Sequence, residues 1–566
     1  MQSIFKNPLW LAFALAATQF TYGQWDPPAD YYSLATGTGS QLKNQLTTIM
    51  SDGHIERRYG DFRDSAAIHD QDPDNSNNIV LVYNGASVDS AWDSGATWNR
   101  EHVWPQSRQP GTASNSTRGN LGDPHALRPA NPSINSSRGN KPFGFGNTVG
   151  SFGSLGDFWF PGDEFKGNMA RSLFYSDTRW SSLGLSLTDG IPSGNQMGDL
   201  SSLVEWHYLD PPDEFERRRN HTIYSQAYNP EFYTNNRNAF VDRPEFVWSI
   251  YVDQQNDSMI SIDGVGDTNG ASSMSIDFGT IIVGGNTALT QSVHLQKAGL
   301  DGTYYSVEIF DDAASELTGR YNAFRMNGTD SQSFDVSLSV DNTTPGINVG
   351  FITVDNLDVT TGGGAGRGGN DADDVIDLSL AVLDHSNASF SSLADQNEIA
   401  MDLGEIESGQ PIGPFEFSIY NLPSPSGDLL TAKLNLFSLD VVPEDAGLQI
   451  TGDLFENLPA TDSREFSVFG TAGEVGSYQA AVVMLLTDED LPGAEFEVLQ
   501  FTITFDVVQA SVVLGDVNQD GIINLLDIQP FINRISTGEF QLEADVNQDG
   551  AVNALDIQPF VELLQS

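Results

Sequence analysis

Hydrophobic and polar positions form three successive patterns along the chain. Up to about residue 251, aromatic residues, Arg and Gly turns mix with helical stretches such as residues 41–50, which predicts one α+β domain. Residues 253–272 are mostly Asp, Asn, Gly and Ser, a composition typical of a linker. From about residue 274 to 508, short runs of alternating apolar and polar residues recur between turns, as at 500–505. This alternation predicts β-sandwiches.

The β-rich region contains an internal repeat. The segment at 276–284 aligns with the segment at 401–409 at an offset of 125 residues, and each enters an alternating strand. Repetition of this kind predicts two related β-sandwich domains, which we place at residues 273–386 and 387–510.

The first 23 residues are typical of a secretory signal peptide. They contain Lys6, then an apolar run over 9–17, then the small-residue ending at 21–23. The apolar run is about half the length that spans a bilayer, and no later stretch is long enough. We therefore expect a secreted or extracellular protein without a transmembrane segment, and association with the cell surface stays open. The absence of Cys from an exported chain makes metal ions, calcium above all, the expected alternative to disulfides.

Charge is distributed unevenly. The formal net charge of -51 argues against a nucleic-acid partner, because affinity for a phosphate backbone comes largely from Lys and Arg. However, acidic residues number 27 against 18 basic ones over residues 24–252, and 50 against 7 from residue 253 onward. Between residues 100 and 141 the balance reverses, and we expect a polyanion to bind there. Glu101 and Asp123 oppose six basic residues in this window: Arg100, Arg108, Arg118, Arg128, Arg138 and Lys141.

The same window holds the densest cluster of chemically active side chains, at 97–105, 123–129 and 134–140. The cluster combines a candidate base, hard oxygen ligands and cations. Phosphodiester hydrolysis needs a base to activate water, a cation to stabilise the developing charge, and donors to orient the phosphate.

Local signals predict a short helix over 132–138 within this cluster. Asn131 is a good N-cap, Pro132 suits the first helical position and Gly139 suits the position after the last turn. Asn135 and Arg138 are three residues apart and are expected to share a face. In an extended strand Glu101 and His102 point to opposite sides, so a common site is expected to need a bend or bulge there.

The motifs resemble the bacterial endonuclease I family over roughly residues 25–250. Asn-Arg-Glu-His-Val-Trp-Pro at 99–105 is similar to the family's strand signature. Asp-x-His-x-Leu-x-Pro at 123–129, with Asn-x-x-Arg at 135–138, is similar to its second strand and helix. The resemblance implies an α+β nuclease domain at 24–252 with a ββα-metal (His-metal) finger. Pro124 and Ala239 depart from the family pattern, which puts loop shape and substrate fit in doubt.

The resemblance also implies roles for individual residues. His102 would be the general base, while Glu101 and Asn135 would bind one divalent ion, Mg2+ or another. The expected products carry 5'-phosphate ends. Arg118 and Arg138 are the candidates for contact with the scissile phosphate. For His125, support of the site and simple packing are both open, and for Arg171 and Arg219 a buried ion pair and substrate contact are both open.

The acidic C-terminus contains a duplicated loop followed by an apolar helix, with the copies 29 residues apart. Oxygen ligands at loop positions 1, 3, 5, 7, 9 and 12, with Gly at 6, suit Ca2+. Residues 511–566 therefore resemble a type I dockerin, which implies two Ca2+ ions and a cohesin-like protein partner; a plain calcium-stabilised module is the alternative. The first loop supplies Asp516, Asn518, Asp520, the carbonyl of Ile522, Asn524 and Asp527; the second supplies Asp545, Asn547, Asp549, the carbonyl of Ala551, Asn553 and Asp556.

The sequence thus predicts a multidomain chain: a nuclease domain, two β-sandwiches and a small helical calcium-binding domain. The expected function is hydrolysis of DNA, with RNA left open, by a metal-dependent endonuclease of little sequence specificity. Two alternatives remain. One is a surface-attached binding or scaffold protein whose nuclease domain is inactive, and the other is a phosphodiesterase of non-nucleic substrates.

Overall fold

A computed structural model describes residues 24–146, 148–252, 258–263, 271–360, 371–443, 447–509 and 511–566. The signal peptide expected at 1–23 lies outside these ranges. The chain divides into two compact units, each described below by itself. The first comprises Met1–Asp277, Leu289–Ser339 and Val349–Ser379; the second comprises Phe278–Ala288, Val340–Asn348 and Leu380–Ser566.

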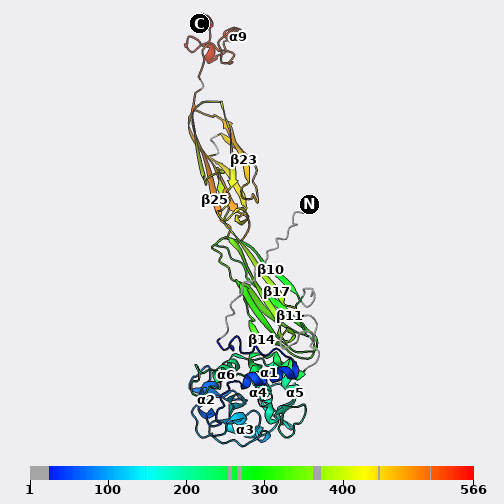
Figure 1. Ribbon diagram of the computed structural model, residues 1–566. Helices are drawn as coiled ribbons and strands as arrows, with labels where there is room; N and C mark the ends of the chain where they lie inside the picture. Colours follow the sequence, from blue (N-terminus) through cyan, green and yellow to red (C-terminus); the bar gives the residue numbers. More distant parts are fainter. Residues whose placement is uncertain are drawn as a thin grey trace. The chain divides into compact units, whose positions relative to one another are not determined.

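Helices dominate residues 24–252, the N-terminal domain (Figure 1). The central helix α4 is buried on almost every side, and the amphipathic helix α1 packs its apolar face against it. The helices are α1 (Gly39–Ser51), α2 (Phe62–His69), α3 (Pro132–Arg138), α4 (Lys166–Arg179), α5 (Leu200–Leu209), α6 (Glu214–Tyr224) and α7 (Ala239–Asp242), with a π-helical turn at Trp248–Val252.

The strands of this domain are short and form two-stranded sheets. The pair β3–β4 is antiparallel, and α3 follows β4 directly. The strands are β1 (Asn78–Val80), β2 (Ser87–Asp89), β3 (Asn99–His102), β4 (Leu127–Ala130), β5 (Gly153–Leu155), β6 (Phe158–Phe160), β7 (Ser186–Leu187) and β8 (Gln196–Met197).

Buried ion pairs hold the helices of the N-terminal domain together. Arg171 contacts Glu216 at 2.5 Å, and Arg219 contacts Asp70 at 2.6 Å, with all four side chains buried. The loss of one partner of a buried pair is costly, because the other charge is then buried without compensation. The structure therefore places Arg171 and Arg219 in ion pairs inside the domain.

The first β domain contains two sheets, ordered β10-β17-β16-β12-β14 and β13-β15-β11-β9. Strand β9 lies within the range expected to be a linker and pairs with β11, so that range contributes a strand. The strands are β9 (Met259–Ile262), β10 (Ser273–Ile282), β11 (Thr290–Ala298), β12 (Thr303–Asp311), β13 (Ala313–Ser315), β14 (Gly319–Phe324), β15 (Asp330–Leu338), β16 (Gly346–Asn356) and β17 (Asp374–Leu383), with the short helix α8 (Leu357–Thr360).

The second β domain has sheets ordered β19-β25-β24-β21 and β18-β20-β23-β22, with a core of its own. Strand β19 begins 125 residues after β10, and each is the edge strand beside the last strand of its domain. The strands are β18 (Ala388–Ser389), β19 (Glu398–Glu407), β20 (Pro411–Asn421), β21 (Leu434–Val442), β22 (Leu448–Thr451), β23 (Ser463–Thr471), β24 (Gly476–Asp488) and β25 (Phe496–Val508).

The apolar core of the N-terminal domain continues onto the first β domain, within the first unit. Tyr304 of β12 and Leu357 of α8 belong to the same buried cluster as Trp206 and Tyr208. The Tyr304 hydroxyl donates to the carbonyl of His207, and its ring lies 5.3 Å from that of Tyr208. The described residues of the two domains therefore share one core.

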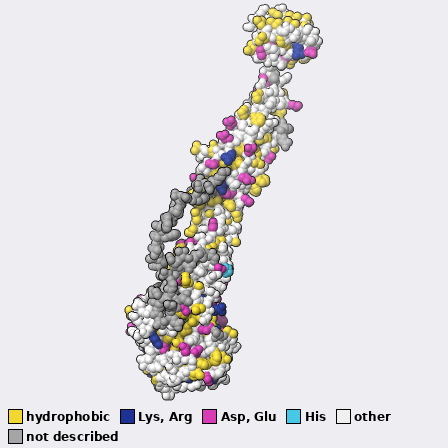
Figure 2. Space-filling model, turned by 90° about the vertical axis from the view of Figure 1, so that its right-hand side faces the viewer, with side chains coloured by type: hydrophobic (Ala, Val, Ile, Leu, Met, Phe, Trp, Pro, Cys, Tyr) yellow, Lys and Arg dark blue, Asp and Glu magenta, His cyan; other side chains and the backbone are white. Residues whose placement is uncertain are grey.

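The C-terminal domain contains two helices, α9 (Ile528–Thr537) and α10 (Ile557–Gln565), whose Phe531 and Phe560 rings stack at 3.9 Å. Asp and Glu side chains are spread over the β domains with few Lys or Arg among them (Figure 2), which agrees with the charge distribution of the sequence. Within the described part of the chain, no helix has the length and hydropathy needed to cross a membrane.

Candidate active site and candidate calcium loops

The strand β3 carries Glu101 and His102, and the helix α3, which follows β4, carries Asn135 and Arg138. Glu101 pairs with Arg128 and His102 with Leu127 in an unshifted antiparallel register. Helix α3 has the predicted bounds: the Asn131 side chain accepts from the first turn, and Gly139, with a φ of 60°, ends the helix. A positive φ favours glycine, which explains its use at this position.

Glu101 is almost completely buried and is held by two donors on one oxygen. The Tyr83 hydroxyl donates to Oε1 at 2.7 Å, and Arg138 Nη1 donates to the same oxygen at 2.8 Å. Oε2 accepts none of the hydrogen bonds among the described residues and is not an enclosed atom, so it contacts solvent. Burial raises the pKa of Glu101 above its ordinary value, although Arg138 and Tyr83 oppose this shift.

Arg138, a candidate for contact with the scissile phosphate, is enclosed in the structure. Its side chain is 1% exposed, and besides Glu101 it donates to the backbone carbonyls of His102 and Val103 at 2.9 and 2.7 Å. A guanidinium enclosed in this way presents no free face to a phosphate in solvent. The contacts of Arg138 in the structure are therefore Glu101 and the backbone of β3 and the residue after it.

His102 has one ring nitrogen committed and one open. Nε2 lies 3.1 Å from the carbonyl oxygen of Leu121; because a carbonyl only accepts, Nε2 carries the proton. Nδ1 then holds the lone pair; it has no hydrogen bond among the described residues and is not enclosed. Burial lowers the pKa of His102 to about 4, so the ring is neutral at pH 7. This tautomer is the one a general base needs.

Glu101 and His102 lie on opposite faces of β3, as strand alternation requires. The Glu101 side chain contacts Tyr83 and Arg138, whereas the His102 ring contacts Tyr59 and the Leu121 carbonyl. The bulge expected between them is absent, because the β3–β4 register has no shift.

Asn135 is oriented by its amide nitrogen. Nδ2 donates to Asn99 Oδ1 at 2.8 Å and to the carbonyl of Arg100 at 3.4 Å. The amide oxygen takes no part in the hydrogen bonds of the described residues, and it remains an acceptor beside β3.

His125 lies in a separate buried network. Its Nε2 contacts the carbonyl of Asn236 at 3.1 Å, its backbone nitrogen donates to Asp123, and its ring packs on Tyr175. No hydrogen bond or ring contact links it directly to Glu101, His102 or Asn135 among the described residues. Burial lowers the pKa of His125 to about 4.

Two of the Arg residues in the basic window at 100–141 are buried, so fewer cations reach the surface than the sequence suggests. Arg128 is buried beside Asp70 at 3.6 Å, and Arg138 is paired with Glu101. Arg118 stays exposed and donates to the carbonyl of Glu56. Arg63, from an earlier segment, adds a cation beside Arg100, since it lies close enough to lower the pKa of Arg100.

Sequence reasoning missed two aromatic residues at the site. Tyr59 stacks on the His102 ring with centroids 4.9 Å apart and planes at 19°. Tyr83 has a φ of 77°, a conformation that is costly for an aromatic residue and that clusters at functional sites. The basic and aromatic composition of residues 57–63 is a sequence signal that could have pointed to Tyr59, whereas the sequence around Tyr83 contains no such signal.

The donors fit a hard divalent ion. Glu101 Oε2 and Asn135 Oδ1 are hard oxygen donors, the type of atom that Mg2+ prefers, and Mg2+ is bound by few protein oxygens and keeps several waters. Among the residues the structure describes, no three or more His, Cys, Asp or Glu side chains form a metal cluster.

The two C-terminal loops have matching conformations. In the first, Asp516 accepts from the backbone nitrogens of Asp520 and Gly521, while Asp527 accepts from those of Asn518 and Asn524. The second repeats these four bonds with Asp545 and Asp556. The two loops therefore form the same hydrogen-bonded turn, in which the Asn524 and Asn553 amide nitrogens donate to the carbonyls of Ile522 and Ala551.

Two segments of the chain match known protein families. Residues 38–245 match the family model of endonuclease I, and residues 514–559 match that of the dockerin type I domain. An extracellular ribonuclease of Bacillus amyloliquefaciens is 39% identical over 243 residues, which cover 40% of this chain and 80% of that protein. An extracellular ribonuclease of Bacillus subtilis (strain 168) is 38% identical over 252 residues, covering 42% and 83%.

The similarity of this chain to solved structures is low. The adhesin CfaE of enterotoxigenic Escherichia coli, for example, has a TM-score of 0.24 and 10% identity, covering 43% of this chain and 99% of that one.

The helical domain around β3, β4 and α3 is a nuclease, a hydrolase of phosphodiester bonds. The chain belongs to the endonuclease I family.

Proposed function

We propose that this protein is a secreted endonuclease that hydrolyses RNA and DNA with little sequence specificity, with His102 as the general base. The observation that carries the proposal is the state of His102, a neutral ring whose Nε2 is committed to the Leu121 carbonyl and whose Nδ1 contacts solvent. Such a nitrogen can accept a proton from water. Export and activity on RNA are supported by the relatives, which are extracellular ribonucleases.

Glu101 and Asn135 are the residues that would hold one divalent ion, with Mg2+ as the leading candidate. When bound, the ion supplies positive charge beside the phosphate and the leaving oxygen. Tyr83 and Arg138 hold Glu101 through Oε1, which leaves Oε2 without a protein donor among the described residues. His102 Nδ1 takes a proton from water as the water oxygen attacks phosphorus. The bond between phosphorus and O3' breaks, and a second water gives O3' its proton, which leaves a 5'-phosphate and a 3'-hydroxyl.

Arg118 is the remaining phosphate candidate of the predicted pair, because its side chain is exposed whereas Arg138 is enclosed. It comes from the loop before η2 (Gly119–Leu121), whose last residue supplies the carbonyl to His102. The Arg118 guanidinium is exposed to solvent and lies on the segment that contacts His102, so it can donate to a phosphate there.

We propose that β3, β4 and α3 are a ββα-metal finger and that each β domain is a β-sandwich. The proposed boundaries are 24–252 for the nuclease domain, 258–386 and 387–510 for the sandwiches, and 511–566 for the dockerin-like domain. Matching sheet orders around β10 and β19 support the kinship of the two β domains.

The C-terminal domain is proposed to bind two Ca2+ ions and a cohesin-like protein, which would place the nuclease at a surface or on a scaffold. The matching loops and the dockerin match support this role. Binding of a cohesin domain by residues 24–566 in Ca2+, measured by calorimetry and compared with residues 24–510, tests it.

Nuclease activity is tested by cleavage of plasmid DNA, an RNA transcript and a small phosphodiester by residues 24–566, in Mg2+ and in EDTA. His102→Ala is the active-site variant, and His294→Ala, in the first β domain, is the control. The expected result is cleavage of both polymers that is lost with EDTA and with His102→Ala only. Cleavage of the small diester alone would favour a phosphodiesterase of non-nucleic substrates.

A further inference from the structure

Two residues of β3 contact the same aromatic ring. Strand alternation puts Arg100 and His102 on one face of β3. The Tyr59 ring stacks on the imidazole of His102 at 4.9 Å, and the Arg100 guanidinium carbon lies 3.7 Å from the centre of the same ring. Tyr59 precedes β3 by 40 residues and belongs to a different segment of the domain.

The segment that carries Tyr59 is anchored to both sides of the site. The backbone nitrogen of Tyr59 donates to the carbonyl of Thr117 at 2.8 Å, and Arg100 Nη1 donates to the carbonyl of Tyr59 at 2.7 Å. The Tyr59 hydroxyl forms none of the hydrogen bonds among the described residues, so the ring, and not the hydroxyl, makes the contacts.

Gly122 joins the two groups that touch the His102 ring. A Cβ on Gly122 would lie 2.4 Å from the carbonyl oxygen of Arg57 and 2.9 Å from the backbone nitrogen of Tyr59. The neighbouring residue, Leu121, supplies the carbonyl that accepts from His102 Nε2. The loop that sets the tautomer and the segment that supplies the stack are thus in direct backbone contact.

The two contacts constrain different degrees of freedom. A single hydrogen bond at Nε2 selects the tautomer, but it leaves the ring free to tilt about that atom. A flat ring stacked on the imidazole restrains its plane and therefore the position of Nδ1. Misplacement of a reacting group by about 1 Å costs on the order of a hundredfold in rate.

We propose that Tyr59 is a positioning residue that fixes the plane of His102 and holds Arg100 beside it. This inference rests on the proposed function of His102 as the base. The contribution comes from the flat ring, so Phe at this position serves equally and a branched aliphatic residue does not.

The test uses residues 24–566 and steady-state cleavage of a fluorogenic oligonucleotide in Mg2+. Tyr59→Leu is expected to lower kcat on the order of tenfold to a hundredfold, and Tyr59→Phe to keep kcat within about twofold of wild type. Tyr228→Leu is the matched control, because Tyr228 also contacts a histidine ring, that of His221 at 5.1 Å, away from the site. It is expected to leave kcat unchanged.

Folding is checked by the melting temperature of each variant. A second variant, Gly122→Ala, puts a Cβ against the backbone of Arg57 and Tyr59 while it keeps the Tyr59 ring. Either the Tyr59 segment or the Leu121 carbonyl must shift, so a loss of kcat is expected there too. Wild-type kcat in a folded Tyr59→Leu protein would overturn the inference, as would an equal loss in Tyr59→Phe. The same assay on His102→Ala separates the two proposals: full activity there refutes the base itself, whereas an inactive His102→Ala beside an active Tyr59→Leu refutes only the positioning role.

Discussion

Arg138 donates to Glu101 Oε1 at 2.8 Å, and both side chains are buried. One carboxylate oxygen of the predicted metal ligand therefore already has a protein partner. The pair uses one carboxylate oxygen and leaves the other in contact with solvent. An arginine at the end of α3 therefore sets the orientation of a ligand on β3.

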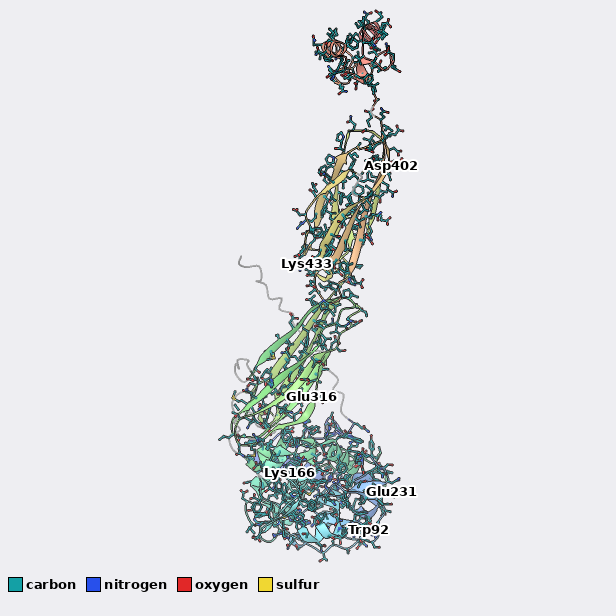
Figure 3. All side chains as sticks on the ribbon, turned by 180° about the vertical axis from the view of Figure 1, so that it is seen from behind. Trp92, Lys166, Glu231, Glu316, Asp402 and Lys433 are labelled. Atoms are coloured by element: carbon teal, nitrogen blue, oxygen red, sulfur yellow. The ribbon has the colours of Figure 1, made fainter. Side chains whose placement is uncertain are left out.

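Arg138→Met removes the cation and leaves Glu101 buried without a charged partner. Loss of one partner of a buried pair costs about 3–5 kcal/mol, so the N-terminal domain is expected to lose about that much unfolding free energy. Urea unfolding followed by Trp fluorescence measures it, because every Trp of the chain precedes residue 249. Asp163→Asn, which breaks the more exposed pair with Lys166, is the control and is expected to cost about 1 kcal/mol or less; Lys166 is labelled in Figure 3. A smaller loss for Arg138→Met than for the control would contradict the role of the pair.

Tyr83→Phe removes the second donor to Glu101. Residues that orient a metal ligand typically change metal affinity by about 10–100-fold when they are lost, so the Mg2+ concentration for half-maximal cleavage is expected to rise by that order. Tyr32→Phe is the matched control, since the Tyr32 hydroxyl donates to the buried Asp242 at 2.6 Å away from the site. An unchanged Mg2+ dependence in Tyr83→Phe would refute this orienting role.

Asp210 gives the N-terminal domain a dependence on pH. Burial raises the pKa of Asp210 from 3.8 to about 7, against the opposing effects of Arg171 and of the Gly167 nitrogen. Between pH 4 and 7 the folded state keeps a proton that the unfolded state has released, so stability falls as pH rises through this window. Asp210→Asn removes this dependence, and its melting temperature relative to wild type is expected to increase from pH 4.5 to pH 8. A difference that stays constant with pH would show that Asp210 does not titrate in this range.

The first β domain is expected to stabilise the nuclease. A chain that ends at residue 252 exposes the surface that Tyr304 and Leu357 cover, whereas a chain that ends at residue 386 keeps it. The melting temperature of residues 24–252, followed by Trp fluorescence, is expected to be lower than that of residues 24–386 by at least roughly 5 °C. Equal melting temperatures would show that the shared core contributes little.

Calcium is expected to fold the C-terminal domain without affecting the nuclease. Arg534 is the single Lys or Arg in residues 511–566 and lies inside α9, so trypsin has one target there. With Ca2+ the bond after Arg534 is expected to resist cleavage, and chelation to expose it while Trp fluorescence stays constant. Asp527→Ala, which removes a ligand of the first loop, is expected to mimic chelation. Equal cleavage rates with and without Ca2+ would contradict the calcium assignment.

The local features of the site were predictable from sequence because short-range signals define them. Asn131, Pro132 and Gly139 carry the start and end of α3, and the structure gives the predicted bounds. The repeat at 276 and 401 likewise marks equivalent edge strands. These signals depend on backbone conformation within a few residues.

The partners of the site residues were not predictable in the same way. Arg138 was expected at a phosphate because its spacing from Asn135 suggested a common face, but its side chain turns into the core to meet Glu101. Tyr59 and Tyr83 reach β3 from segments far along the chain, and no periodicity connects them to it. The shared core around Tyr304 joins two domains, so neither domain's own pattern contains it.

The parallel pairing of β19 with β25 affects how the second β domain responds to force. These strands are the first long strand and the last strand of the domain, and their ladder runs from Glu398 opposite Gln500 to Glu407 opposite Val508. Tension applied to the chain on either side pulls parallel neighbours in opposite directions, which loads the ladder in shear, so that its hydrogen bonds must break together. A nuclease held through its C-terminus to a fixed partner in flowing liquid would thus be joined to it by a domain that resists mechanical extension.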